Sequence, residues 1–414
     1  MPRSAICSRK GSRMPPDAVP DSLRALSGIR VLSLEASVSG PHCSRILADM
    51  GAEVIKIEKP GTGDLIRQWD SAVHGLSSGY VWLNYNKRSF AIDVKKPAGR
   101  EAVERLAERV DVFIENFAPG VAARLGLEAA RLRQKNPRLI YCSISGYGQD
   151  GPYRDVKAYD LLIQGEAGII ASTGSPEQPA KVSVPIADLA VSMYGVTGVL
   201  LALFQRQQTG QGQVIDVSMF ESILSWLAYF PHHYWHRGEE AERVGMRHHF
   251  MTPYGPYLAS DGVYVNMAVA TPQDWEVFCR GVIERPGLLE DGRFHTSEKR
   301  RENRAVLERL LEEIFLEQPS ADWLQRLEAA RLPHGLVRNI GSVLSHPQVI
   351  ARKMIAQVES PVGPVPVIAS PLHLSASPQR LDPIPSLGQD TEAILQELGY
   401  SRPQIEQLRA DGVI

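Results

Sequence analysis

One aspartate stands where a carboxylate could act as a nucleophile. Asp188 lies in SVPIADLAVSMYG (183–195), between a short β-like run and a long apolar stretch. An aspartate at a helix start commonly caps the helix, because its oxygen accepts a backbone N–H and its charge suits the positive end of the dipole. The same surroundings would keep an exposed carboxylate ionised and aimed, as a nucleophile requires. The local pattern alone favours the cap, so the rest of the chain must decide between the two.

Several cations lie close to the ends of expected strands. Lys87, Arg88 and Lys95 occur in NKRSFAIDVKKP, and Lys157 occurs in VKAYD. Each alone is more commonly an ordinary solvated charge. Several of them at one crevice would form an anion site suited to phosphate groups.

Histidines cluster in HHYWHRGEEAERVGMRHH (232–249). His232 and His236 have the i, i+4 spacing of a helical metal site, but no HExxH pattern accompanies them. We therefore predict no metal ion, and we expect this segment to form a wet, aromatic interface arm.

Strands and helices alternate in the first half of the chain. The apolar runs predict strands at 28–36, 52–60, 88–94, 111–117, 138–148 and 214–220. Helical periodicity predicts helices at 42–51, 97–110 and 189–208. Such alternation indicates an α/β fold, with a Rossmann-like parallel sheet covered by helices on both faces. In the helix at 189–208, Gly195 and Gly198 would let another backbone approach closely.

Composition sets the domain organisation. A chain of 414 residues exceeds the roughly 250–300 residues at which single cores stop growing, so we expect two domains. A large α/β domain starts at 28–221, and a linker arm follows at 222–250. A smaller α+β domain at 251–335 opens with a hairpin, and 336–414 returns to the large domain and ends in two short helices. Residues 1–27 form a tail.

The same numbers exclude several functions. The net charge of −2 gives no basic excess, so we expect neither nucleic acid nor a membrane surface as a partner. No apolar run approaches the roughly 20 residues that span a bilayer. The four cysteines lack CxxC spacing, which suits a reducing cytoplasm. The tail lacks the apolar core of a secretory signal. A transit peptide is the less favoured alternative, and Met14 is an alternative start.

Nucleotide-binding motifs are missing from the predicted sheet. The first strand–helix turn, EASVSGPHCSR, lacks GxGxxG, and no GxxxxGK[ST] occurs. Neither a dinucleotide nor a P-loop nucleotide is therefore expected. The crevice at the carboxyl ends of the strands remains the expected ligand site.

Five motifs in order resemble the successive signatures of the class III coenzyme A transferases. They are VLSLEASVSGPHCSRILADMGAEVIKIEKPGTGD, NKRSFAIDVKKPAGRE, DVFIENFAPGVAARLG, NPRLIYCSISGYGQDGPY and TGQGQVIDVSMFES. This family includes formyl-CoA transferase and the carnitine and bile-acid CoA transferases. The resemblance runs from Gly28 to the C-terminal GQDTEAILQELGY and so covers nearly the whole chain.

The resemblance implies a role for Asp188 and an assembly. In the family, one aspartate opens a long helix and attacks the donor acyl-CoA, forming an aspartyl anhydride and then an enzyme–CoA thioester. Asp188 occupies that position, and the nucleophile then outweighs the cap, although one side chain can do both. CoA is a substrate and no permanent cofactor is implied. The family forms interlocked homodimers, and the arm at 222–250 would thread through the partner.

The resemblance also implies the residues that contact CoA. These are Val38, Ser39, Lys59, Ile92, Lys95, Asn116, Phe117, Arg124, Lys157, Ala158 and Tyr159. Lys59, Lys95, Arg124 and Lys157 are the expected phosphate partners.

Departures from the family pattern narrow the expected substrate. Val38 replaces the glutamine of the formyl-CoA branch, and no glycine-rich flap lies near HHFMTPYGPY, so formate and oxalate are not expected. Tyr159 replaces the histidine of the racemase branch, which leaves two-base proton exchange without one base.

The segment starting at Arg247 resembles the branch that acts on C4 and C5 dicarboxylates (mesaconate, itaconate, citramalate or malate), often with succinyl-CoA. A dry site must neutralise the second carboxylate of such an acid. We expect Arg247 to do so, with His248 as the alternative. A 2-methylacyl-CoA racemase and a non-catalytic acyl-CoA-binding protein remain the other hypotheses.

Overall fold

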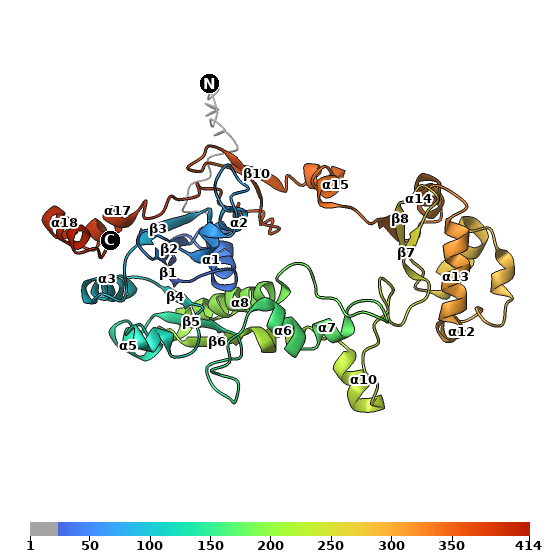
Figure 1. The fold of residues 1–414 in the computed structure, drawn as a ribbon, viewed down its shortest axis with the longest axis horizontal. Coiled ribbons are helices and arrows are strands. Elements are labelled where there is room, and N and C mark those ends of the chain that lie inside the picture. The colour runs from blue at the N-terminus through green and yellow to red at the C-terminus, as the bar shows by residue number, and fades with distance from the viewer. Residues whose placement is uncertain (1–23) are drawn as a thin grey trace, which may run out of the picture. The chain divides into compact units, whose positions relative to one another are not determined.

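Six parallel strands form a single sheet in the order β3-β2-β1-β4-β5-β6 (Figure 1). The strands are β1 Arg30–Leu34, β2 Glu53–Glu58, β3 Lys87–Ala91, β4 Val112–Glu115, β5 Ile140–Ser145 and β6 Val214–Ser218. All six strands expected from the sequence are present. The centres of β1 to β5 are buried, as the continuous apolar runs predict for a parallel sheet, whereas the edge strand β6 is largely exposed or half-buried. The strand order reverses between β1 and β4.

The structure is a computed structural model that describes residues 24–414, and it divides into two units. The large unit contains the sheet and comprises the described residues up to Ala158, together with Ala187–Ser222 and Lys353–Ile414. The small unit comprises Tyr159–Ile186 and Ile223–Arg352.

The unit boundaries differ from the sequence-based ones at two places. Residues 159–186 group with the small unit, because the aromatic arm packs on them: Arg243 donates to the carbonyls of Ala171, Ser175 and Pro176. Residues 24–27, which we assigned to the tail, form a turn, and the Leu26 N–H donates to the Met50 carbonyl (3.0 Å). The rest of the predicted tail and Met14 lie outside the described residues.

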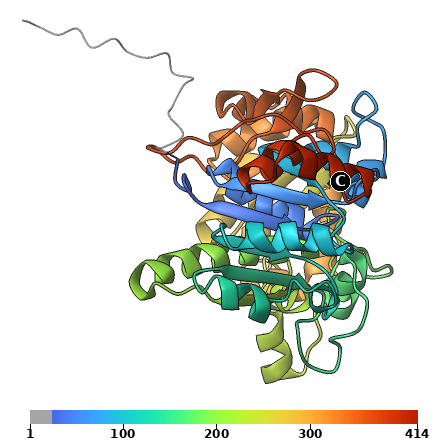
Figure 2. The same ribbon diagram turned by 90° about the vertical axis from the view of Figure 1, so that its left-hand side faces the viewer.

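Helices cover both faces of the sheet, as expected (Figure 2). One face carries α3 Pro97–Ala107, α5 Ala129–Lys135, α17 Thr391–Glu397 and α18 Arg402–Ala410, which share an apolar core with the strands. The other face carries α1 Ser39–Asp49 and α8 Ile186–Thr209. The expected final two helices are therefore α17 and α18.

We expected Gly195 and Gly198 of α8 to let another backbone approach closely, but side chains of neighbouring elements lie against them instead. A Cβ on Gly195 would lie 3.0 Å from Cys43 Sγ, and a Cβ on Gly198 would lie 2.9 Å from Cγ2 of Ile215. Both positions pack α8 tightly onto α1 and the sheet.

Helix α8 corrects one expectation. We expected no apolar run long enough for a bilayer, yet α8 has 24 residues and is apolar enough, by length and composition alone, to cross one. Half of its most apolar window is buried within the protein. A helix that packs in this way on a sheet is typical of a protein core.

The sequence did not reveal several elements of the large unit. They are the helices α2 Ser78–Asn84, α4 Val121–Arg124 and α9 Met219–Ser225 (which runs on into the small unit), the hairpin strands β10 Ile355–Val358 and β11 Val365–Ile368, and a 3₁₀ helix at Leu65–Gln68. The hairpin and α2 form a second apolar core with Val38.

The small unit contains a three-stranded antiparallel sheet in the order β7-β8-β9. The strands are β7 Tyr254–Leu258, β8 Tyr264–Ala268 and β9 His334–Leu336; β7 and β8 form the expected hairpin. Its core is shared with α11 Pro272–Val277, α13 Arg304–Phe315, α14 Ser320–Ala329 and a π-helical turn at Phe278–Val282. The remaining helices are α6 Asp160–Glu166, α7 Ile169–Ser172, α10 Phe230–Arg237, α12 Ser297–Glu302, α15 Ile340–Leu344, α16 Pro347–Ala351 and a 3₁₀ helix at Pro286–Leu289.

A buried carboxylate at the end of β2 anchors the segment that follows it. Glu58 receives two hydrogen bonds from the Arg67 guanidinium, both 2.8 Å, and one from the Ser89 hydroxyl at 2.7 Å. Burial alone would raise the pKa of Glu58, but the hydrogen bonds from Arg67 and the charge of Lys56 outweigh it and hold the pKa at about 2. Because this pKa is lower than in the unfolded chain, the ionised form stabilises the fold.

We predict that Glu58→Gln lowers the stability of the large unit by an amount that depends on pH. Above pH ~4.5 the loss should be on the order of 3 kcal/mol, the equivalent of the pKa shift. The loss should shrink as pH falls toward 2, because the wild-type carboxyl is then protonated too. Thermal unfolding of both proteins at a series of pH values measures this loss of stability. Glu101→Gln, an exposed acid on α3, is the control; a pH-independent gap between Glu58→Gln and wild type would contradict the prediction.

Candidate active site

The strand order reverses between β1 and β4, and ligands commonly bind at such a reversal, at the carboxyl edge of a parallel sheet. The loops that follow β1 and β4 lie at this edge, where the sequence predicts the ligand crevice. The predicted CoA contacts other than Tyr159 lie in the large unit, in loops and helix starts that follow β1, β2, β3, β4 and β5. Tyr159 is exposed and precedes α6 in the small unit.

Asn116 ties together the two loops at the crevice. Its Oδ1 accepts from the Ala36 N–H (2.9 Å), and its Nδ2 donates to the Ala36 carbonyl (2.8 Å) and to Ser39 Oγ (3.0 Å). Both amide protons are therefore used within the protein. Asn116, a predicted CoA contact, uses its side chain to hold the loop after β1 in place.

Buried charged side chains also hold the loop after β1 in place. Lys87 Nζ donates to Glu35 (2.8 Å) and to the Pro41 carbonyl (2.9 Å), and Lys56 Nζ donates to Asp64 (2.6 Å). Asp64 in turn accepts from the N–H of Ser37 (3.1 Å), which holds a positive φ of 61°. That backbone conformation is uncommon for serine and requires such support.

Two of the cations proposed for an anion site are therefore structural. Burial lowers the pKa of Lys87 to about 8, against the raising effect of Glu35, and its ammonium has no access to a ligand. Arg88 is bound to Glu53 (2.5 Å) and Glu397 (2.7 Å) at the edge of the sheet. The sequence showed their charges but not these partners.

Two further predicted contacts can offer only backbone atoms. Val38 is 2% exposed and packs in the core with the hairpin, and Ile92 is 1% exposed in the core with α3. Phe117 is partly buried against the core that contains Ile92 and α3. For Val38 and Ile92, a CoA contact through the side chain is excluded by burial.

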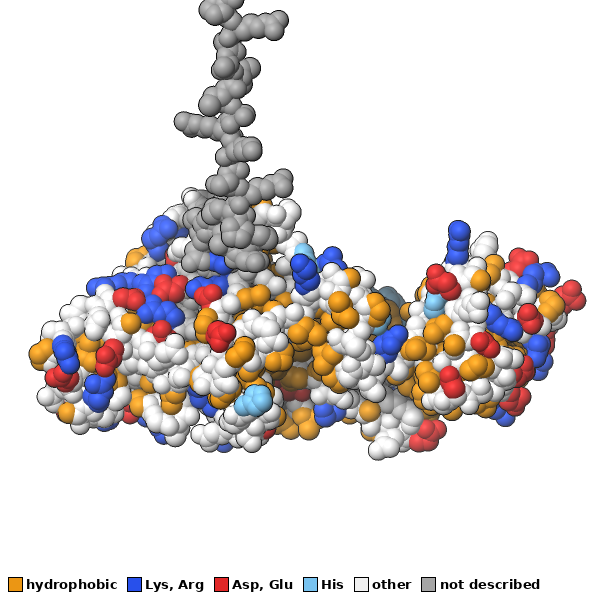
Figure 3. All heavy atoms as spheres, turned by 90° about the horizontal axis from the view of Figure 1, so that it is seen from above, with side chains coloured by type: hydrophobic (Ala, Val, Ile, Leu, Met, Phe, Trp, Pro, Cys, Tyr) orange, Lys and Arg blue, Asp and Glu red, His pale blue; other side chains and the backbone are white. Residues whose placement is uncertain are grey.

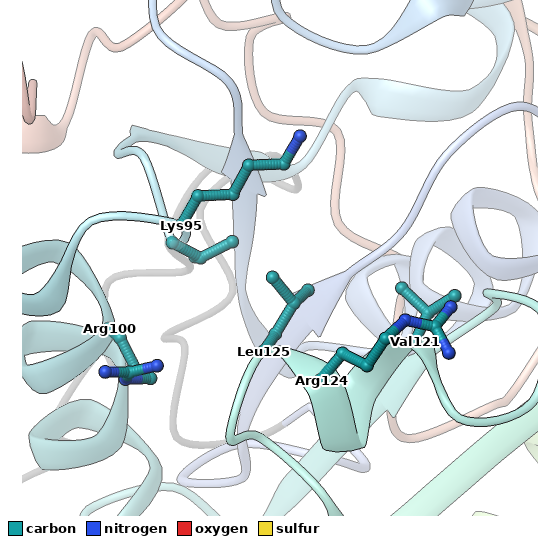
Figure 4. Close-up of a pocket in the computed structure, with 6 residues that line it drawn as sticks. Lys95, Arg100, Val121, Arg124 and Leu125 are labelled. Atoms are coloured by element: carbon teal, nitrogen blue, oxygen red, sulfur yellow. The ribbon is translucent and has the colours of Figure 1, made fainter.

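A pocket of about 330 Å³ at this edge is lined by cations. Lys95 follows β3, Arg100 lies on α3 and Arg124 lies on α4, and Figure 4 shows Leu125 between the two arginines. Val94 and Val121 complete the lining. None of the three cations forms an ion pair with any residue in 24–414. Unpaired cations around one pocket favour an anionic ligand such as a phosphate.

The pocket is lined by two of the predicted phosphate partners and by one cation that the sequence analysis did not select. It brings together Lys95 and Arg124, two of the four expected phosphate partners, whereas Lys59 and Lys157 are exposed in other loops of this edge. Arg100 was missed. Its only signal in the sequence is its position in the helix that begins directly after the strand-end lysine.

The face of the protein seen in Figure 3 carries charges of both signs. Lys and Arg side chains alternate there with Asp and Glu, and apolar side chains lie between them.

Asp188 lies inside the first turn of α8. The helix begins at Ile186, two residues earlier, so Asp188 is not the residue that precedes the helix as a cap. It is partly exposed, while its neighbours Ala187 and Ala190 are buried. The positive end of the helix dipole favours an ionised carboxylate at this position. The geometry thus permits a nucleophile that stays charged.

Arg247 does not have the free guanidinium that a substrate clamp needs. Its Nε lies 3.0 Å from Glu308, its Nη2 lies 3.0 Å from Glu312, and the group stacks over Tyr257 at 4.1 Å. His248 is also occupied, since Nδ1 accepts from the N–H groups of two residues in the following turn and the ring stacks on Tyr254. Both residues organise the small unit, which counts against either as the partner of a substrate carboxylate.

The two histidines of α10 with metal-site spacing stack on each other. The rings of His232 and His236 are stacked, with centroids 6.3 Å apart and planes within 6°. Over the part of the chain that the structure describes, no group of three or more His, Cys, Asp or Glu side chains could hold a metal ion.

Comparison with known proteins agrees with this architecture. A family model described as CoA-transferase family III matches residues 26–391. A succinyl-CoA:glutarate CoA-transferase of Mus musculus is 34% identical over 399 residues, covering 95% of this chain and 91% of the mouse protein. A succinyl-CoA–D-citramalate CoA-transferase of Chloroflexus aurantiacus is 35% identical over 401 residues, covering 94% and 98%.

A solved structure shares the fold over nearly the whole chain. The crystal structure of a CAIB/BAIF family protein from Brucella suis superposes with a TM-score of 0.81 and 35% identity, covering 91% of this chain and 99% of that one. The resemblance inferred from the five sequence motifs is thereby confirmed. This chain belongs to CoA-transferase family III and is a class III CoA-transferase.

Proposed function

We propose that this enzyme moves CoA from succinyl-CoA or another dicarboxylyl-CoA to a C4 or C5 dicarboxylic acid, with Asp188 as the nucleophile. The observation that carries the proposal is the position of Asp188, a partly exposed carboxylate at the positive end of α8, in the unit that also holds the pocket with three unpaired cations. Two relatives are a succinyl-CoA:glutarate CoA-transferase and a succinyl-CoA–D-citramalate CoA-transferase, which supports a dicarboxylic acid as the acceptor.

The proposed reaction keeps the energy of the thioester. An Asp188 oxygen attacks the thioester carbonyl carbon; the C–S bond breaks, CoA leaves as a thiolate, and a mixed anhydride forms. The thiolate then attacks the Asp188 carbonyl carbon, which releases the donor acid as a carboxylate and leaves an enzyme–CoA thioester. The acceptor carboxylate reverses both steps. Water must be kept out, because it would hydrolyse the anhydride.

We infer that two copies of the chain associate, as the family's interlocked homodimer implies. Along α8, Met193, Leu200, Leu201 and Phe204 share one exposed face, and Leu201 and Phe204 are each 63% exposed. In the small unit, Trp235 of the arm is 69% exposed. Apolar faces of this kind mark protein interfaces.

We also propose a cytoplasmic location. Cys43, Cys142 and Cys279 are free, buried thiols. Free thiols suit a reducing compartment.

We predict that Asp188→Asn lowers CoA transfer at least about a thousandfold, because no other group forms the covalent intermediate. The assay follows CoA exchange between succinyl-CoA and glutarate, with butyrate as the monocarboxylate comparison. Hydroxylamine trapping during turnover should label Asp188 of the wild type. Asp322→Asn, the same third position of helix α14, is the control.

Several outcomes would contradict this mechanism or this substrate class. Residual turnover by Asp188→Asn, or labelling at another acid, would exclude Asp188 as the nucleophile. A wild-type preference for butyrate would exclude the dicarboxylate class. Exchange of the α-proton of a 2-methylacyl-CoA without transfer would favour the racemase, and binding without either reaction would favour the non-catalytic protein.

The pocket generates a second prediction. If its cations bind CoA phosphates, Arg100→Gln should raise the KM for succinyl-CoA by about tenfold, the scale of one charge-assisted hydrogen bond. The kcat should change little. Arg301→Gln, an exposed arginine of the small unit, is the matched control. An unchanged KM for Arg100→Gln would place the phosphates elsewhere.

The exposed face of α8 generates a third prediction. Light scattering should give the wild type a mass near twice 45.7 kDa at micromolar concentration. Replacing both Leu201 and Phe204 by Glu should reduce the dimer fraction, since charges would be buried at the interface. Leu316→Glu, 51% exposed on the small unit, is the control. A stable wild-type monomer would refute the dimer.

A further inference from the structure

Ser192 lies one turn after Asp188 on α8 and is fully buried. Its hydroxyl lies 2.6 Å from the carbonyl oxygen of Asp188 and 2.7 Å from that of Ser39. A helical serine commonly bonds to the carbonyl four residues earlier. The second acceptor belongs to α1, so this one hydroxyl connects the main chain of Asp188 to another element.

The acceptor on α1 is itself held in place. Asn116 Nδ2 donates to Ser39 Oγ (3.0 Å) and to the Ala36 carbonyl (2.8 Å). A continuous path of hydrogen bonds therefore runs from the loop after β4, through the first residue of α1, to the first turn of α8. Every member of this path belongs to the large unit.

Close packing on both sides leaves this path little freedom. A Cβ on Gly40 would lie 2.9 Å from Asn116 Cγ and 2.9 Å from Glu35 Cβ. A Cβ on Gly195 would lie 3.0 Å from Cys43 Sγ. The elements around Ser192 are thus closely packed, and its single hydroxyl proton is shared between the carbonyl oxygens of Ser39 and Asp188, which holds α1 and α8 in register.

We propose that Ser192 is a positioning residue for catalysis, which fixes the first turn of α8, and so the Asp188 carboxylate, relative to the loops of the CoA crevice. The proposal rests on the proposed function, in which Asp188 is the nucleophile. A nucleophile must approach the thioester carbon at a defined distance and angle, and a displacement of about 1 Å can cost roughly a hundredfold in rate. Ser192 acts through the main chain and does not touch substrate.

The test compares hydroxyl-removing and hydroxyl-retaining variants. Ser192→Ala should lower kcat by about ten- to a hundredfold, with KM for succinyl-CoA and for the acid within about threefold of wild type. Ser192→Cys fills the site with only a weak donor and should lose nearly as much. Ser192→Thr retains the hydroxyl and should recover most of the rate.

A matched control lies on the same helix. The Thr197 hydroxyl donates to the Met193 carbonyl (2.8 Å), which is the same backward bond without the contact to α1. Thr197→Val should therefore keep the wild-type kcat. Single-turnover trapping of the Asp188 intermediate should slow for Ser192→Ala and Ser192→Cys only, and thermal unfolding of each variant should show a folded protein.

The outcomes separate this proposal from the proposed function. Turnover by Asp188→Asn would overturn the proposed function, and with it the role of Ser192. An inactive Asp188→Asn beside wild-type kcat in Ser192→Ala or Ser192→Cys would overturn the positioning role alone. So would a rate loss that matches the fraction of unfolded protein, or an equal loss in Thr197→Val.

Discussion

Four charged side chains that have almost no contact with solvent hold the loop at the centre of the crevice. Glu35, Lys56, Asp64 and Lys87 have side chains that are at most 1% exposed, and each lies within 3.5 Å of an opposite charge. Ions buried so deeply are tolerated only when they are paired and hydrogen bonded, since removing one partner costs ~3–5 kcal/mol. The loop after β1 has one conformation because these pairs allow few others, including the left-handed backbone of Ser37.

Uncharged side chains connect that loop to the neighbouring elements by hydrogen bonds. Asn116 links the loops after β1 and β4, and Ser192 links α1 to α8. The cations of the pocket have the opposite character: Lys95 and Arg124 are exposed and form no ion pair with the described residues 24–414. Charges that shape the protein are thus buried and paired, whereas those suited to an incoming anion are left in water.

Much of this could be predicted from the sequence, because periodicity and strand-end position are local properties. The six strands, the helix that carries Asp188 and the position of Lys95 at the crevice all followed from such patterns. The errors concern partners that are distant along the chain. Lys87 pairs with a carboxylate 52 residues away, and Arg247 donates to Glu312, 65 residues away. A sequence shows that a residue is charged, but not whether the fold has already used that charge.

The division of the chain into two units has a consequence for its synthesis. The sheet is complete once Ser218 has been made, yet α17 and α18, which cover part of one face, are made only after the small unit. Most of the small unit, Ile223–Arg352, is translated in between. Throughout that interval the apolar face over β3 lacks its cover, which is the kind of surface that chaperones bind. The large unit therefore completes its folding only after the small unit has been made.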